Sequence, residues 1–265
     1  MNNKIIEWLQ KTGYPLELFG ESILNQLDFK IINSYIYVDF EKQINRELDL
    51  FGSFDSKKDD INLSLNLLIE CKKSDKAIIL LKSNSSSKNY IKLNEYVTID
   101  NPNARAIIKD CPKIFLPGRS SFGFKVIQAF TDGDEFTNKA ANTLIKSLHE
   151  FNSNSLEYLE DAIEGNQHSL ALPVLLIDAP LFELVIDENK EMKLNEIDSC
   201  VLEYRNLIPN LEKEFLIPII QKQHFKEFVE NYKVCSKSIL DFLSINKSFQ
   251  IKKYHTAKMV FEDLE

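Results

Sequence analysis

Hydrophobic and polar positions follow two periods along the first third of the chain. Residues 16–28 carry apolar side chains spaced for one face of a helix. Residues 29–40 and 46–54 are rich in β-branched and aromatic side chains with a period near two, which predicts two antiparallel strands. Residues 63–73 form a nearly continuous apolar run that ends in charge, as a buried third strand does, and residues 77–81 continue or restart that strand.

The remaining two thirds predict an irregular segment followed by further helices and strands. Residues 84–125, which contain Pro102, Pro112 and Pro117, are expected to be an excursion from the sheet. Residues 134–151 predict a helix with Asp134 as its N-cap. The later elements are a buried strand at 170–179, a segment at 181–186 that continues or pairs with it, strands at 201–207 and 215–220, and a closing helical region at 224–245. This order predicts a mixed α/β sheet with helices.

Length and composition set the class of protein. The chain has 265 residues, of which 44% are hydrophobic, so one large domain or two small ones fit its length. Four cysteines, Cys71, Cys111, Cys200 and Cys235, form no CxxC pair, which argues against a structural zinc site and a disulfide framework. We therefore expect a reducing, cytoplasmic location. The N-terminus lacks a long apolar segment with a cleavage site, and no window approaches a membrane-spanning length.

The net charge of −8 is unevenly distributed. Residues 76–125 carry 9 Lys and Arg against 3 Asp and Glu, a net charge of +6, whereas residues 126–265 carry a net charge of −10. A basic block in an acidic chain is either a solvated face or a surface that contacts phosphate.

Two charged clusters lie at the ends of otherwise apolar strands and carry the candidate chemistry. Arg46-Glu47-Leu48-Asp49 lies on the second predicted strand, and Glu70-Cys71-Lys72 ends the third. Side chains alternate across a strand, so Glu70 and Lys72 are expected on one face and Cys71 on the other. If the two strands are adjacent, Asp49 lies beside Glu70, and two carboxylates next to a lysine suit Mg²⁺ with several retained waters.

These residues resemble the PD-(D/E)xK nuclease superfamily, the restriction-endonuclease-like fold. The resemblance rests on Asp49, on Glu70-Cys71-Lys72, on the two strands that carry them and on the preceding helix. It implies an αβββαβ core with a mixed sheet flanked by helices, formed by about 14–82 and 134–180. We expect a single domain over residues 1–265, with a basic insertion at about 84–125 and added C-terminal strands and a helix at about 181–250.

The resemblance also implies roles for individual residues. Asp49 and Glu70 would bind the metal, Lys72 would position the attacking water, and the backbone carbonyl of Cys71 would add a ligand without its thiol taking part. Glu17 matches the acid that often completes the site from the first helix, and it is expected to be catalytic, with Glu21 as a rival. Glu47 is a further candidate ligand. Leu48 stands where the literal motif has proline, at a position that varies in the superfamily.

Residues expected to bind nucleic acid are Arg46, Lys88, Lys92, Arg105 and Arg119. Arg46 has an alternative role, an ion pair with its neighbours Glu47 or Asp49. Tyr90 and Tyr96, interleaved with lysines, are candidates for stacking on bases. The four histidines have no metal-ligand spacing, and the sequence has no Ser-His-Asp arrangement, Walker lysine loop or GxGxxG motif.

Two functions from different classes follow. The first is a nuclease that uses Mg²⁺ or Mn²⁺ to hydrolyse DNA, in restriction, defence or repair, with a homodimer or a larger assembly as the implied partner. The second is a catalytically inactive nuclease-like module that binds or assembles with a protein through its acidic second half. In that case Glu70 and Lys72 form an ordinary strand-end ion pair.

Overall fold

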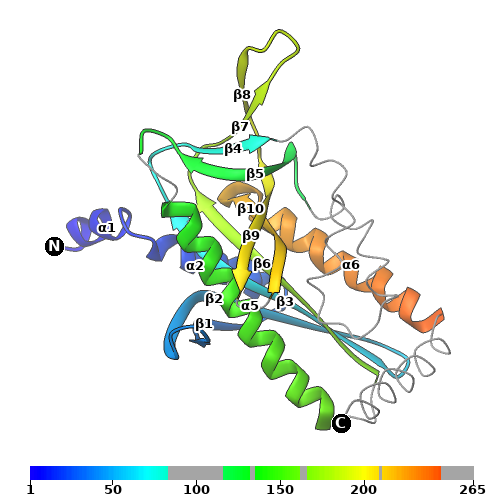
Figure 1. Ribbon diagram of the computed structural model, residues 1–265. Helices are drawn as coiled ribbons and strands as arrows, with labels where there is room; N and C mark the ends of the chain where they lie inside the picture. Colours follow the sequence, from blue (N-terminus) through cyan, green and yellow to red (C-terminus); the bar gives the residue numbers. More distant parts are fainter. Residues whose placement is uncertain (83–115, 132–134, 162–165, 209–210, 246–265) are drawn as a thin grey trace.

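The computed structural model describes residues 1–82, 116–131, 135–161, 166–208 and 211–245, and these ranges form one continuous mixed sheet with helices on both faces (Figure 1). The elements in chain order are α1 (Asn2–Leu9), α2 (Tyr14–Gln26), β1 (Lys30–Asp39), β2 (Ile44–Lys58), β3 (Ile61–Lys73), β4 (Ile78–Lys82), β5 (Ser120–Gln128), α5 (Glu135–Asp161), β6 (Asn166–Asp178), β7 (Leu181–Ile186), β8 (Met192–Glu196), β9 (Ser199–Ile208), β10 (Leu211–Gln221), the short 3₁₀ helix η2 (Lys222–His224) and α6 (Phe225–Ile245). The fold is therefore α/β, as the sequence predicts.

Ten strands lie in the order β1-β2-β3-β6-β10-β9-β5-β4-β7-β8. β1, β2 and β3 form an antiparallel meander, and β6 then pairs with β3 in parallel along its whole length. A parallel neighbour needs a long crossover, and α5 is the helix within it. β10 continues the sheet beyond β6, also in parallel, so β3 and β6 are both interior strands.

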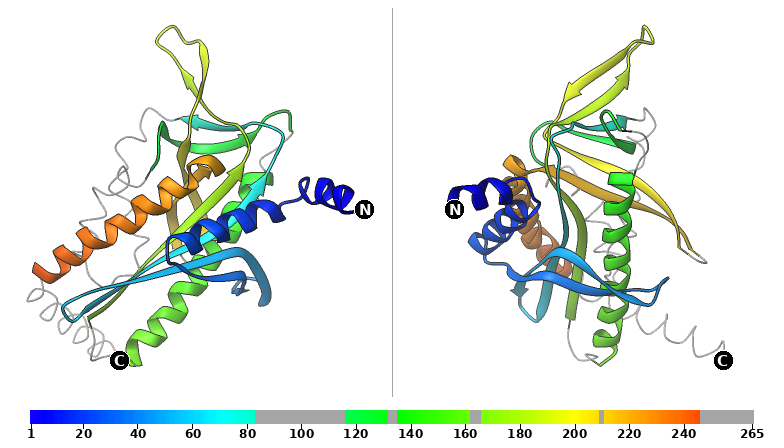
Figure 2. Two further views of the ribbon diagram at one scale, coloured as in Figure 1. Left: turned by 180° about the vertical axis from the view of Figure 1, so that it is seen from behind. Right: turned by 90° about the vertical axis from the view of Figure 1, so that its left-hand side faces the viewer.

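Helices cover the central strands from both sides (Figure 2). α5 packs on one face, and α2 and α6 pack together on the other. The side chains of α5 that follow the predicted spacing of four, Ala140, Leu144 and Leu148, are buried. Because each buried leucine contributes about 1.5–3 kcal/mol, this apolar stripe holds the crossover helix on the sheet.

The local predictions for the first strands and the closing helix are confirmed, with one difference in length. The predicted strands cover 46–54 and 63–73, but β2 continues to Lys58 and β3 begins at Ile61. The reversal needs only Asp59 and Asp60, because Asp59 adopts a left-handed conformation with φ of 55°. A short polar side chain tolerates that conformation better than a bulky one.

Two predictions about pairing are wrong, and a third prediction missed a strand. Residues 77–81 form a strand, but β4 leaves β3 and pairs with β5 and β7 at the other side of the sheet. Residues 181–186 do not pair with 170–179, because β7 pairs with β4 and β8. The expected irregular excursion 84–125 ends in a regular strand, since β5 begins at Ser120. Neighbours in the sequence are thus separated in the sheet, which periodicity alone does not reveal.

Two elements were not predicted. α1 has no buried residue and projects from the body at the N-terminus (Figure 1). β8 is exposed along its whole length and forms the outer strand of the hairpin with β7. Neither contributes to the core, and both are short, with 8 residues in α1 and 5 in β8. The predicted N-cap Asp134 lies outside the described residues.

None of the helices in the described ranges has both the length and the apolar character needed to span a membrane.

The β4–β5 pairing gives a first prediction. A Cβ added at Gly123 would lie 2.4 Å from the backbone oxygen of Leu81 and 2.7 Å from a side-chain carbon of Leu80. Gly123→Ala should therefore lower the free energy of unfolding by about 1–3 kcal/mol, as overpacking does. Urea denaturation measures this change. At Gly13 the nearest contact is an ordinary 3.6 Å, so Gly13→Ala is the control and should have a much smaller effect. Equal stability of the two variants would contradict the pairing.

Candidate active site

Asp49 and the Glu70–Lys72 segment lie together because β2 and β3 are adjacent. Their register pairs Leu50 with Ile69, the residues next to Asp49 and Glu70. Oδ2 of Asp49 accepts a hydrogen bond from the backbone N–H of Cys71 at 2.6 Å. The expected proximity of the two carboxylates is therefore confirmed, and Asp49 is fixed to the strand that carries Glu70.

Glu70 is a carboxylate inside the sheet, with a side chain only 8% exposed. Its Oε1 accepts a hydrogen bond from Nζ of Lys72 at 2.5 Å, whereas Oε2 is buried and has no hydrogen-bond partner in the described part of the chain. Burial raises the pKa of Glu70 to about 7; Lys72 lowers it, Asp49 raises it, and Lys139 on α5 lowers it. A buried carboxylate oxygen without a partner is costly and calls for a cation or a proton.

Lys72 contacts two of the expected metal-binding groups at once. Besides the ion pair with Glu70, its Nζ donates to the backbone carbonyl of Cys71 at 3.2 Å. Glu70 and Lys72 thus share a face of β3, as alternation predicts. The ammonium group neutralises the oxygens that a metal ion would otherwise neutralise.

Glu17, in the first turn of α2, belongs to the same group of charges. Burial raises the pKa of its carboxyl, and the nearby Asp49 and Glu47 raise it further, whereas Lys72 lowers it. The helix therefore places an acid within electrostatic reach of Asp49. Burial also raises the pKa of Asp49, against the lowering effects of the Cys71 N–H and Lys72. Three or four carboxylates that raise one another's pKa create a site that favours positive charge.

The oxygens of these groups are the candidate ligands for a metal ion. Within the described residues, no group of three or more His, Cys, Asp and Glu side chains is arranged to hold a metal ion. Mg²⁺ often uses only one or two carboxylates and keeps several waters. Burial raises the pKa of the Cys71 thiol well above its usual value, so the sulfur stays protonated and is a poor ligand. The oxygens in this region that could serve a metal ion belong to Asp49, to Glu70, whose Oε2 has no partner among the described residues, and to the Cys71 carbonyl.

Of the residues expected to bind nucleic acid, the structure describes Arg46 and Arg119, and these two lie in different parts of the sheet. Arg46 forms an ion pair at 2.8 Å with Asp39, rather than with Glu47 or Asp49, so that alternative is corrected. Arg119 lies far along the sheet order, at the start of β5, and contacts Asp198. Lys88, Lys92, Arg105, Tyr90 and Tyr96 lie outside the described residues.

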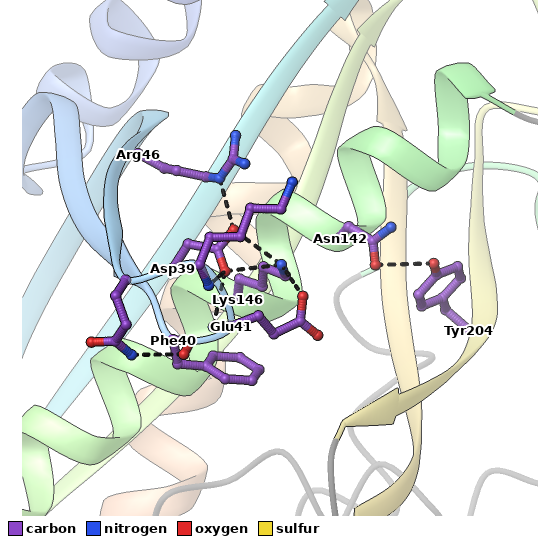
Figure 3. Close-up of polar contacts among 9 residues, drawn as sticks. Asp39, Phe40, Glu41, Arg46, Asn142, Lys146 and Tyr204 are labelled. Atoms are coloured by element: carbon purple, nitrogen blue, oxygen red, sulfur yellow. Dashed lines mark hydrogen bonds and ion pairs between the residues drawn. The ribbon is translucent and has the colours of Figure 1, made fainter.

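Sequence analysis missed a second group of polar residues next to the site. Asp39, at the end of β1, is fully buried and is bonded by Arg46 and by Lys146 of α5 (Figure 3). Tyr37, two residues earlier on β1, is also buried. Tyr37 and Asp39 are two residues apart in an apolar segment, so both lie on the same face of the strand. This spacing could have indicated the group from the sequence, because a carboxylate at a core position needs partners.

The described histidines have no role in this site. His149 lies against the ring of Phe40, with centroids 4.5 Å apart, and Nε2 of His224 lies 3.3 Å from Asp198. His168 is half-buried near the start of β6, and burial lowers its pKa. His255 lies outside the described residues.

Comparison with known proteins does not extend this picture, because no family model, curated protein or solved structure matches the chain.

The buried Glu70 gives a prediction about stability and pH. Its pKa in the folded protein is about 7, above the ordinary value of 4.5. The folded protein therefore binds a proton at Glu70 more tightly than the unfolded chain does. As pH rises from 4.5 to above 7, ionisation of Glu70 lowers the stability of the fold. Glu70→Gln removes this penalty. Relative to the natural protein, the variant should gain roughly 3 kcal/mol of unfolding free energy between pH 4.5 and 8 in metal-free buffer, at 1.36 kcal/mol per pKa unit.

Urea denaturation across this pH range measures the effect, with Asp55→Asn as the control. Hydrogen bonds from Lys30 and Ser64 lower the pKa of Asp55, so its ionised form stabilises the fold and that stability is lost as pH falls. The Asn variant should therefore lose stability relative to the natural protein as pH rises. The same pH trend in both variants would contradict the assignment of Glu70.

Proposed function

We propose that this chain is a metal-dependent nuclease that hydrolyses DNA phosphodiester bonds on a restriction-endonuclease-like core. The proposal depends mainly on one observation: Glu70 has a buried oxygen without a partner in the described residues, beside Asp49 and Lys72. An interior apolar strand rarely ends in such a group unless the group has a function.

The order of elements supports the proposal. An αβββαβ core requires a helix, three antiparallel strands, and a crossover helix that leads to a further strand. α2, the β1-β2-β3 meander, α5 and β6 occur in this order, with β4 and β5 inserted before α5. The location of the candidate residues also supports the proposal, with Asp49 on β2, Glu70 and Lys72 near the end of β3, and Glu17 on α2.

Each residue would have a distinct part in hydrolysis. Asp49 and Glu70, with the Cys71 carbonyl, would hold Mg²⁺ or Mn²⁺. The bound ion would polarise the scissile phosphate and stabilise the charge that develops on it. Lys72 would orient the attacking water through its ammonium group. Glu17 would bind a further water or complete the charge of the site, because the helix holds it within reach of Asp49.

Substrate binding would involve the basic segment. Residues 76–125 carry a net charge of +6 in a chain of net charge −8, and most of this segment lies outside the described residues. Charge of this kind holds the phosphate backbone without reading sequence.

An inactive binding or assembly module is the second candidate. Its support is the Glu70–Lys72 ion pair, which forms without any metal ion. Metal binding and metal-dependent cleavage distinguish the two functions.

Titration with Mn²⁺ tests the ligands. Asp49→Asn and Glu70→Gln should each weaken binding by at least about tenfold, because each removes a charged oxygen ligand. Both should also abolish cleavage of plasmid DNA. The matched control is Asp55→Asn, a carboxylate removed from the same strand, which should bind Mn²⁺ and cleave like the natural protein. A natural protein that binds no Mn²⁺ and cleaves no DNA would overturn the nuclease and favour the binding module.

Lys72→Met tests the role of the ammonium group. The variant should keep or increase its affinity for Mn²⁺, because the cation that occupies Glu70 and the Cys71 carbonyl is gone. Cleavage should fall by about a hundredfold or more, as when a group that acts on the nucleophile is lost. Calorimetry and a cleavage time course separate the two effects. Cleavage at the natural rate would exclude Lys72 from the reaction.

A further inference from the structure

The carboxylate of Asp39 is the best-bonded polar group near the candidate site (Figure 3). Nζ of Lys146 lies 3.0 Å from both of its oxygens, Nε of Arg46 donates to it at 2.8 Å, and the backbone N–H groups of Glu41 and Lys42 donate at 3.1 and 3.3 Å. Burial alone would raise the pKa of Asp39, but these hydrogen bonds outweigh it and lower the pKa to about 2. Asp39 is therefore a fixed anion.

The two cations that bind Asp39 differ in how many of their hydrogen-bond donors have a partner. Lys146 is only 12% exposed, and it bonds Glu41 at 2.5 Å as well as Asp39, so its charge is matched. Arg46 is 40% exposed and is held through Nε alone. Its two terminal nitrogens have no hydrogen-bond partner in the described ranges, and Figure 3 shows the end of the guanidinium group directed away from Asp39.

Arg46 lies at the edge of the candidate active site. It is three residues before Asp49 on β2, and it is opposite Tyr37 in the register of β1 and β2. The buried hydroxyl of Tyr37 is within electrostatic reach of both Arg46 and Glu70. Tyr37 therefore lies between the two charged groups in the electrostatics of the site, opposite Arg46 in the register and within reach of the charge of Glu70.

We propose that Arg46 binds a DNA phosphate next to the scissile one, and that Asp39, fixed by Lys146, is the residue that positions it. The inference rests on the proposed nuclease function and adds a phosphate contact to it. A guanidinium group is planar and always charged, so it can bond a carboxylate through Nε while its terminal nitrogens bond a phosphate. An ammonium group presents no such fork and cannot hold both partners in fixed geometry.

The test measures binding of a short fluorescein-labelled DNA duplex by anisotropy, in EDTA and at several salt concentrations, so that no cleavage occurs. Arg46→Ala should weaken binding about tenfold and lower the magnitude of the salt slope by about one unit, as loss of one phosphate contact does. The matched control is Lys58→Ala. Lys58 lies on the same strand, is 42% exposed and pairs with Asp241 at 2.7 Å. Lys58→Ala therefore removes a similar charge at a distant position and should bind the duplex like the natural protein.

Two further variants test the positioning role. Arg46→Lys keeps the charge but not the fork, and it should lose affinity as far as Arg46→Ala does. Asp39→Asn should produce the same loss, and the double variant Asp39→Asn with Arg46→Ala should be no weaker than either single variant. If Asp39→Asn does not fold, Arg46→Lys decides the question. Natural affinity in Arg46→Lys, or an Arg46→Ala variant that binds like Lys58→Ala, would overturn the inference.

Mn²⁺ titration separates failure of this inference from failure of the nuclease function. Arg46→Ala should bind Mn²⁺ like the natural protein, because Arg46 is not a ligand. If the natural protein binds no Mn²⁺ and Arg46→Ala still loses DNA affinity and salt slope, the nuclease function fails and the phosphate contact stands.

Discussion

A carboxylate buried in an interior strand is the constraint on which the candidate site depends. Glu70 lies on β3 between β2 and β6, directly opposite Leu175 in the parallel register. Removing an unpaired carboxylate from water costs several kcal/mol, so the fold must supply positive charge or a proton at this position. Lys72 supplies part of that charge, and the high pKa of Glu70 shows that the compensation is incomplete.

The charges around Glu70 form two groups with different balances. In the first, Glu17, Asp49 and Glu70 outnumber Lys72, and burial raises the pKa of each carboxyl. In the second, Lys146 and Arg46 match Asp39 and Glu41, and the pKa of Asp39 falls to about 2. A site that lacks positive charge therefore lies next to one that is fully compensated. This contrast supports a metal site with an adjacent fixed guanidinium group, which is the arrangement that the proposed function needs.

The sequence predicted the local elements of the core and much of the candidate site. Residues 63–73 form a strand because their apolar run is long enough for an interior position, and Glu70 and Lys72 share a face because strand side chains alternate. It did not predict that β4 leaves β3 and pairs with β5 and β7. Strand pairing depends on contacts between distant segments, and the apolar pattern of β4 fits either neighbour. For the same reason the sequence suggested an ion pair between Arg46 and its neighbours Glu47 or Asp49, whereas its partner in the structure is Asp39 on the adjacent strand.

By itself, the sequence determined most of the helices and strands of the core and which residues are candidates for metal chemistry, because periodicity and residue type are local properties. Only the tertiary structure decided that Asp49 is bonded to the backbone of Cys71, that one oxygen of Glu70 is left without a partner among the described residues, and that Asp39 holds Arg46 through its Nε. Burial and hydrogen bonding depend on which distant segments pack together. The charge state of a carboxylate follows from that packing and is not set by its place in the sequence.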